Sequence, residues 1–264
     1  MNFTVERYRQ LASQMNIGVP PKVYITAIWG KDFSICSGCA PMAHYMTTTP
    51  SFVPNFLQPL LQTTINLALP FAKLLPDIII PASKGFNKDY ILATTLHEYT
   101  HAAHAHLAGA GFWTNVLAGE IANMINHGRP YGYRMPAAIA SAPEVGVAEA
   151  WAECIENYMM YLLTGADIYL NHIENHYQNP DHASEISDWV PSGLYFDLWD
   201  SNGSLPVLED PSKNVMDEVD GITWGIMYRN LLGIHNFNAY KNKLILLYPA
   251  KRQTIETLFY SYSY

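Results

Sequence analysis

Residues 87–107 read NKDYILATTLHEYTHAAHAHL, and this stretch predicts a long helix that carries two histidines on one face. Asn87 can cap the first turn, and Asp89 lies within that turn, where the helix dipole favours an acid. Two glycines follow at positions 109–111. Because glycine commonly ends helices, we expect the helix to stop just after Leu107.

The two histidines, His97 and His101, are four residues apart. This spacing places their side chains one turn apart on the same face, so both imidazoles can reach a single metal ion. Neutral imidazole is a good zinc ligand. Glu98 is rotated by about 100° from His97, which puts its carboxylate beside the ion, where it can accept a proton from a zinc-bound water. The HExxH pattern therefore predicts two zinc ligands and a catalytic base.

A catalytic zinc site needs a third protein ligand and one open position for water. The extended pattern HExxHxxGxxH does not supply that ligand, because His104 and Leu107 stand where the pattern has glycine and histidine. His104 lies on the same face as His97 but about 10 Å farther along the helix axis. We therefore expect His104 to line a cleft or to bond a carboxylate, and not to complete the site.

Glu149 is the favoured third ligand. It lies in a second predicted helix, near residues 143–165, among side chains that are apolar almost all round. Glu153 follows one turn later on the same face, so one carboxylate can bind zinc while the other accepts the free N–H of a zinc-binding histidine. Glu120 is the alternative ligand, but the residue one turn after it is Met124 and not a second acid.

The HExxH motif at 97–101, followed by the ExxxE segment at 149–153, resembles the zincin superfamily of metallopeptidases and, within it, the gluzincin (thermolysin-like) branch. In that family the first acid of the second motif is the third zinc ligand, and the acid four residues later supports a zinc-bound histidine. The resemblance covers residues 76–165 and implies these roles for Glu149 and Glu153. The chain departs from the family in its longer interval between the motifs and in a glutamate where aspartate is usual.

The motif and the resemblance together imply a zinc-dependent hydrolase, and in particular a metallopeptidase with peptide or protein substrates. Zinc would polarise the peptide carbonyl, while Glu98 would take a proton from the bound water and pass it to the leaving amine. Four side chains are eligible, by chemistry alone, to stabilise the oxyanion beside the zinc: Tyr131, Tyr133, Tyr228 and His235. The alternative is a non-catalytic zincin-like binding or surface-interaction module whose cleft is blocked, for example by residues 128–142.

The predicted elements give an α+β fold of the zincin type, with a small mixed sheet, the HExxH helix and a mainly helical C-terminal part. We expect one domain over residues 1–264, with possible sub-lobes 1–110 and 111–264 on either side of the cleft. The strands are expected at residues 23–29 and 76–81. Further helices are expected at residues 4–16, 113–126, 143–165, 224–232 and 251–260, a loop at 40–59, and mixed loops and short elements at 178–220.

The composition argues against two classes of partner. The net charge is −8 and no run of Lys and Arg occurs, so we expect no nucleic-acid groove. No apolar run of 18 residues occurs, so we expect no membrane span, and the first residues lack the apolar region of a signal peptide. Charged residues are only 14 % of the chain, which favours a secreted or periplasmic protein whose signal peptide is absent from this sequence.

The three cysteines do not indicate a disulfide scaffold. Cys36 and Cys39 form a lone CxxC motif with His44 nearby, and no second Cys or His pair follows in matching position. We therefore interpret this motif as a turn with two thiols or a local disulfide, in preference to a zinc or redox site. Cys154 falls within a helical pattern and is expected to be buried as a small apolar residue.

Overall fold

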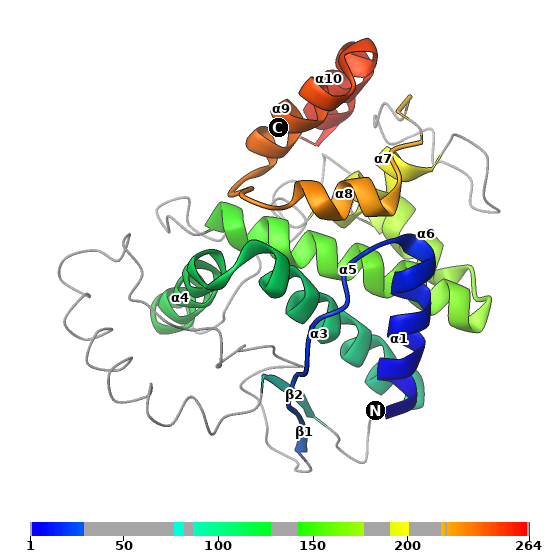
Figure 1. Ribbon diagram of the computed structural model, residues 1–264, viewed down its shortest axis with the longest axis vertical. Helices are drawn as coiled ribbons and strands as arrows, with labels where there is room; N and C mark the ends of the chain where they lie inside the picture. The colour runs from blue at the N-terminus through cyan, green and yellow to red at the C-terminus, as the bar shows by residue number, and fades with distance from the viewer. Residues whose placement is uncertain are drawn as a thin grey trace.

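The computed structural model describes residues 2–28, 77–81, 87–127, 142–176, 191–200, 218–219, 221–262 and 264. Helices make up most of this part, together with a two-stranded sheet (Figure 1). The coarse prediction of an α+β protein with a mainly helical C-terminal part is therefore consistent with the structure. Several sequence predictions concern residues outside the described ranges: Cys36, Cys39, His44, Tyr131, Tyr133 and the loops at 40–59 and 128–142.

Helix α3 (Lys88–Ala108) is the helix that the opening stretch predicts. The side chain of Asn87 accepts a hydrogen bond from the backbone N–H of Tyr90 at 2.7 Å, which confirms the predicted N-cap. At the other end Gly109 has a φ of 85°, and its N–H donates to the carbonyl of Ala105. This positive φ favours glycine, so the helix ends where the sequence predicts.

Helix α4 (Ala110–His127) begins directly after Gly109, a few residues earlier than expected, because one glycine is enough to redirect the chain. Helix α5 (Ala142–Thr164) agrees with the predicted helix at 143–165. It lies along α3, and its other sides are covered by α6 (Ile168–His176) and α7 (Ser192–Trp199) (Figure 1). This enclosure explains why α5 is apolar almost all round its surface.

The other helices cover this central pair. Helix α1 (Asn2–Met15) packs on α3, where the ring of Tyr8 lies edge-on to the ring of Tyr99 at a centroid distance of 4.9 Å. The C-terminal part comprises α8 (Trp224–Asn230), α9 (Phe237–Leu247), the 3₁₀ helix η4 (Pro249–Lys251) and α10 (Arg252–Ser261). Helices α6 and α9 are not among the predicted elements, and α7 falls in the stretch 178–220, where loops and short elements are expected.

The sheet pairs β1 (Ile25–Ile28) with β2 (Ile78–Pro81) in parallel, with Ile25 opposite Ile78. The side chain of Asp77 accepts a hydrogen bond from the N–H of Tyr24, and the N–H of Asp77 donates to the carbonyl of Tyr24. These two bonds fix the start of the register. Within the described ranges both strands run in the same direction, so the predicted mixed sheet is seen there as a parallel pair.

Buried side chains from these elements form one hydrophobic cluster. Cys154 is part of it as a free, buried thiol, as the sequence predicts. The predicted single domain with sub-lobes 1–110 and 111–264 stays a prediction. Among the helices that the structure describes, none combines the length and the apolar character needed to cross a bilayer.

The end of α1 packs closely against α8 through two glycines. A Cβ added at Gly18 would lie 2.0 Å from the hydroxyl oxygen of Tyr228, and one added at Gly225 would lie 2.7 Å from the backbone oxygen of Asn16. The Tyr228 hydroxyl in turn donates to the carbonyl of Ala103 at 2.8 Å. These contacts attach α8 both to the segment after α1 and to α3.

We expect Gly225→Ala to destabilise the protein by about 1–3 kcal/mol, because the added methyl group overpacks against the backbone of Asn16. Gly111→Ala is the matched control. Both glycines are the second residue of their helices, and no described atom lies within 4 Å of a Cβ at Gly111. The control should gain up to about 1 kcal/mol from helix propensity. Urea unfolding of both variants measures the difference, and equal changes would contradict the close contact.

Candidate metal centre

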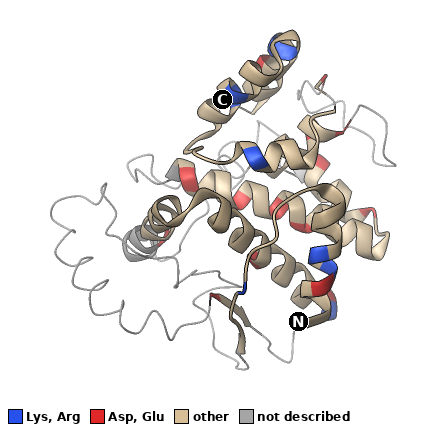
Figure 2. Ribbon diagram, in the orientation of Figure 1, with Lys and Arg blue, Asp and Glu red and all other residues tan. Residues whose placement is uncertain are grey.

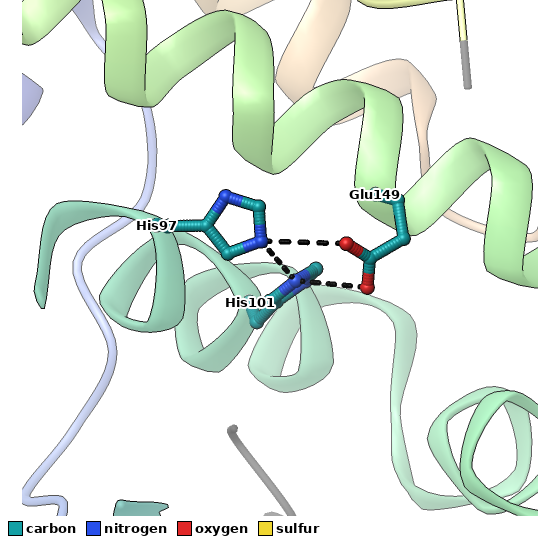
Figure 3. A group of neighbouring side chains, drawn as sticks. All are labelled: His97, His101 and Glu149. Atoms are coloured by element: carbon teal, nitrogen blue, oxygen red, sulfur yellow. Dashed lines mark hydrogen bonds and ion pairs between the residues drawn. The ribbon is translucent and has the colours of Figure 1, made fainter. Parts of the chain in front are cut away.

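Three side chains converge between α3 and α5: His97 and His101 from α3, and Glu149 from α5 (Figure 3). The two Nε2 atoms of the histidines are 3.0 Å apart. The Glu149 carboxylate oxygens lie 3.4 Å from Nε2 of His97 and 3.2 Å from Nε2 of His101. The structure thus brings together the two predicted ligands and the favoured third one.

The distances between these ligand atoms fit one small metal ion. Zinc bonds of about 2.0–2.2 Å in a tetrahedral site separate neighbouring ligand atoms by about 3.3–3.5 Å. The two Nε2 atoms are 3.0 Å apart, Oε1 of Glu149 lies 3.2 Å from Nε2 of His101, and Oε2 lies 3.4 Å from Nε2 of His97, so the separations taken over both carboxylate oxygens are close to this value. Two imidazole nitrogens and one carboxylate oxygen are a donor set that zinc accepts, and three protein ligands leave the fourth position open.

The pairing of the two helices places a further carboxylate at the site. Oε2 of Glu156 lies 2.9 Å from Nδ1 of His97. Glu156 is seven residues after Glu149, which is two turns and returns to the same face of α5 within about 20°. Glu149 touches both histidines, whereas Glu156 reaches only the earlier one. The helices therefore run antiparallel here.

Glu156, and not the predicted Glu153, supports a histidine of the pair. When His97 binds a metal through Nε2, its Nδ1 carries the proton and donates it to Glu156, which fixes the tautomer. Glu153 instead lies 3.3 Å from Nε2 of His172 on α6. A residue four positions after Glu149 is displaced by about 40° round the helix, in the opposite sense from Glu156. That displacement directs Glu153 towards α6 and away from α3.

Glu98, the predicted base, is 5 % exposed. Burial raises the pKa of Glu98 to about 8; the charge of His97 opposes this shift, and the carboxylates of Glu149 and Glu156 add to it. Glu98 is thus close enough to the group of His97, His101 and Glu149 for the charges of that group to shift its pKa. A cation held by that group would favour the ionised form of Glu98, which is the form that accepts a proton.

The charges of the ligands depend on one another. Burial alone would lower the pKa of His97, but its hydrogen bonds with Glu149 and Glu156 outweigh burial, and this pKa lies well above its usual range. Burial lowers the pKa of His101. Burial alone would raise the pKa of Glu149, but His101 and His97 hold it far below its usual range. Glu149 is therefore ionised and paired with a histidine before any metal binds.

Glu120, the alternative third ligand, lies on α4 near the site. Burial raises its pKa well above the usual range, and the negative charges of Glu149 and Glu98 raise it further. In the described part of the chain, however, the group of metal-ligating atoms lying within 4.8 Å of one another contains Glu149 and does not contain Glu120. The geometry therefore favours Glu149 as the ligand.

All four glutamates of α5 contact histidines. Two face the histidine pair of α3, while Glu144 lies 3.1 Å from Nδ1 of His235 and Glu153 contacts His172. Neither α4 nor α5 contains Lys or Arg, and Lys88 at its first position is the one such residue in α3 (Figure 2). The described parts of these three helices therefore carry more negative than positive side chains near the group, which favours cations.

The other residues considered from the sequence have different surroundings. The Tyr228 hydroxyl donates to the carbonyl of Ala103, and His235 is paired with Glu144, so each of these possible oxyanion donors has a partner already. His104 is fully buried next to the pair, and its surroundings are considered below.

A cavity of about 490 Å³ lies on the opposite side of α3. Tyr99 lines it, and this residue is rotated by about 200° from His97 round the helix axis. The rest of the lining comes from α1 and from the chain around the start of β1: Asn2, Val5, Glu6, Arg9, Lys22, Val23 and Ile25. This cavity is therefore separate from the candidate metal centre.

Comparison with known proteins gives no match: no family model, no curated protein and no solved structure is significantly similar to this chain. The description of the centre rests on its residues and their geometry.

We expect Glu156→Ala to weaken zinc binding by about 10–100-fold, because His97 loses the acceptor that orients its ring. Glu153→Ala is the matched control, since it removes the same charge from the same helix but contacts His172. Competition with a chromophoric chelator measures both affinities. Equal weakening in the two variants would show that only the loss of negative charge matters and would contradict the role of Glu156.

Proposed function

We propose that this protein is a zinc-dependent hydrolase, and specifically a peptidase of the zincin type. The observation that carries the proposal is the convergence of His97, His101 and Glu149 from two packed helices, with Glu98 buried beside them. The peptide nature of the substrate is inferred from the resemblance of the two motifs to the gluzincin branch. The secreted or periplasmic location inferred from the composition is part of the same proposal.

Zinc is the metal that best suits this donor set. Two of the three ligand atoms are imidazole nitrogens, whereas magnesium and calcium prefer sites made of oxygen alone. The ligands lie on helices that are held by packing on several sides, so their relative positions are set before a metal arrives. Among the described residues the group has three ligands and no fourth. Catalytic zinc sites have this arrangement, whereas structural sites are closed by four protein ligands.

When bound, zinc would supply Lewis-acid chemistry, acidifying a water and polarising a carbonyl. The protein's own part in the reaction belongs mainly to Glu98. Its carboxylate would accept the proton of the attacking water and return it to the leaving amine. Burial makes this carboxylate a stronger base than an exposed glutamate. Glu156 would meanwhile hold the ring of His97 in place through Nδ1.

We expect the hydrolytic activity of Glu98→Gln to be at least about 10²-fold below that of the wild type, because the amide cannot accept the proton. Its zinc content should equal that of the wild type. Glu153→Gln is the control, an equivalent change on a carboxylate that contacts His172. Cleavage of casein and of a peptide library measures activity. An active Glu98→Gln protein would contradict the mechanism. A wild type that binds zinc but cleaves nothing would instead support the non-catalytic binding module.

The identity of the third ligand has its own test. We expect the wild type to carry one zinc ion, Glu149→Ala to lose it, and Glu120→Ala to keep it, as measured by mass spectrometry of metal content on proteins purified side by side. Loss in Glu120→Ala alone would leave a metal site with a different third ligand. A wild type that takes up no zinc even after loading would refute the metal site and with it the proposed function.

A further inference from the structure

His104 is a buried histidine for which the residues that the structure describes provide no hydrogen-bond partner. Its exposed fraction is 0 %, and neither Nδ1 nor Nε2 is paired there. A buried polar group left unpaired costs about 1–3 kcal/mol, and such groups are rare in folded proteins. A leucine would fill the same space without this cost, so the imidazole at this position calls for a reason.

Its neighbours are the second metal ligand and the start of α4. His104 follows His101 by three residues, a spacing that makes the two side chains adjacent on the surface of α3. Two consecutive aromatic residues of α4 cover them: the ring of Phe112 lies 5.1 Å from that of His104, and the ring of Trp113 lies 5.4 Å from that of His101. Both imidazoles are therefore enclosed between α3 and α4.

Two further buried nitrogens in the same enclosure have no partner within the described ranges, Nδ1 of His101 and Nε1 of Trp113. Because Nε2 of His101 faces Glu149, its Nδ1 bears the proton when the ring binds a metal. The indole N–H is always a donor. Two N–H donors thus occur in the enclosure that also holds His104, whose ring offers one acceptor nitrogen when it is neutral.

We propose that His104 is a positioning residue for the metal ligand His101, acting through one buried water. The water would accept the N–H groups of His101 and Trp113 and donate to a ring nitrogen of His104. Three hydrogen bonds are the usual number for a buried water. This role rests on the proposed metal site, and it gives His101 what Glu156 gives His97: a partner on Nδ1 that fixes the tautomer and leaves Nε2 free for the metal.

This role and a purely space-filling role predict different zinc affinities for His104→Leu. A space-filling histidine can be replaced by leucine with no loss of stability and no change in zinc affinity. A positioning histidine predicts a split result. Zinc affinity would fall by about 10–100-fold, because the water that orients His101 loses its acceptor, while the metal-free protein would still fold.

The experiment measures zinc affinity by chelator competition and the melting temperature of the metal-free protein. The variants are His104→Leu, His104→Gln, which keeps a donor and an acceptor, and His106→Leu, an exposed histidine of the same helix. We expect the zinc affinity of His104→Leu to fall by about 10–100-fold. The zinc affinity of His104→Gln should stay within a few-fold of the wild type, and that of His106→Leu should equal the wild type. If His104→Leu does not fold, His104→Met, whose flexible side chain adapts to irregular space, gives the same comparison.

The outcomes separate this inference from the proposed function. If the wild type binds zinc and His104→Leu binds it equally well, the positioning role is overturned and the metal site stands. If His104→Gln loses as much affinity as His104→Leu, hydrogen bonding through this position is not what matters, and the role is again overturned. If the wild type binds no zinc, both the proposed function and the role of His104 fail together.

Discussion

The antiparallel packing of α3 on α5 is the contact on which the other features of the molecule depend. It places two histidines of one helix against two glutamates of the other; His101 and Glu149 are buried, and His97 and Glu156 are partly buried. Buried charges are costly unless they are paired, and removing one partner leaves the other uncompensated. The paired side chains therefore fix how far α3 and α5 can slide along each other, in addition to holding the two helices together. The same fixed position brings ligand atoms of His97, His101 and Glu149 within 4.8 Å of one another.

The surrounding elements keep this pair of helices from adjusting. Helix α5 is enclosed by α3, α4, α6 and α7, so the Glu149 side chain cannot turn towards solvent. One residue with positive φ, Gly109, joins α3 to α4 without a longer loop and so places Phe112 and Trp113 near the imidazoles. Ligands carried by packed helices are positioned more accurately than ligands on loops.

Local signals in the sequence predicted individual helices, but they could not predict which side of one helix faces its neighbour. Asn87 and the glycine after α3 predicted that helix, and the apolar surroundings of Glu149 marked it as a buried acid. The choice between Glu153 and Glu156 depends on which side of α5 meets α3, and helical spacing permits both. Helix α9 escaped prediction because its Asn and aromatic residues have low helix propensity; burial of side chains such as Leu244 stabilises it, and its cap at Asn236 was the one local signal.

The use of histidine as the partner of every glutamate on α5 has a chemical consequence. A Lys or Arg beside Glu149 would be a permanent cation that competes with a metal for the carboxylate. A histidine can pair with Glu149 as a cation and then bind the metal as a neutral ligand once its proton leaves. Because hydrogen bonds with Glu149 and Glu156 hold the pKa of His97 above its usual range, the proton is retained to higher pH, and a metal that bound here would have to displace it. Metal affinity at such a site falls as the pH falls, and the buried charges remain paired in both states.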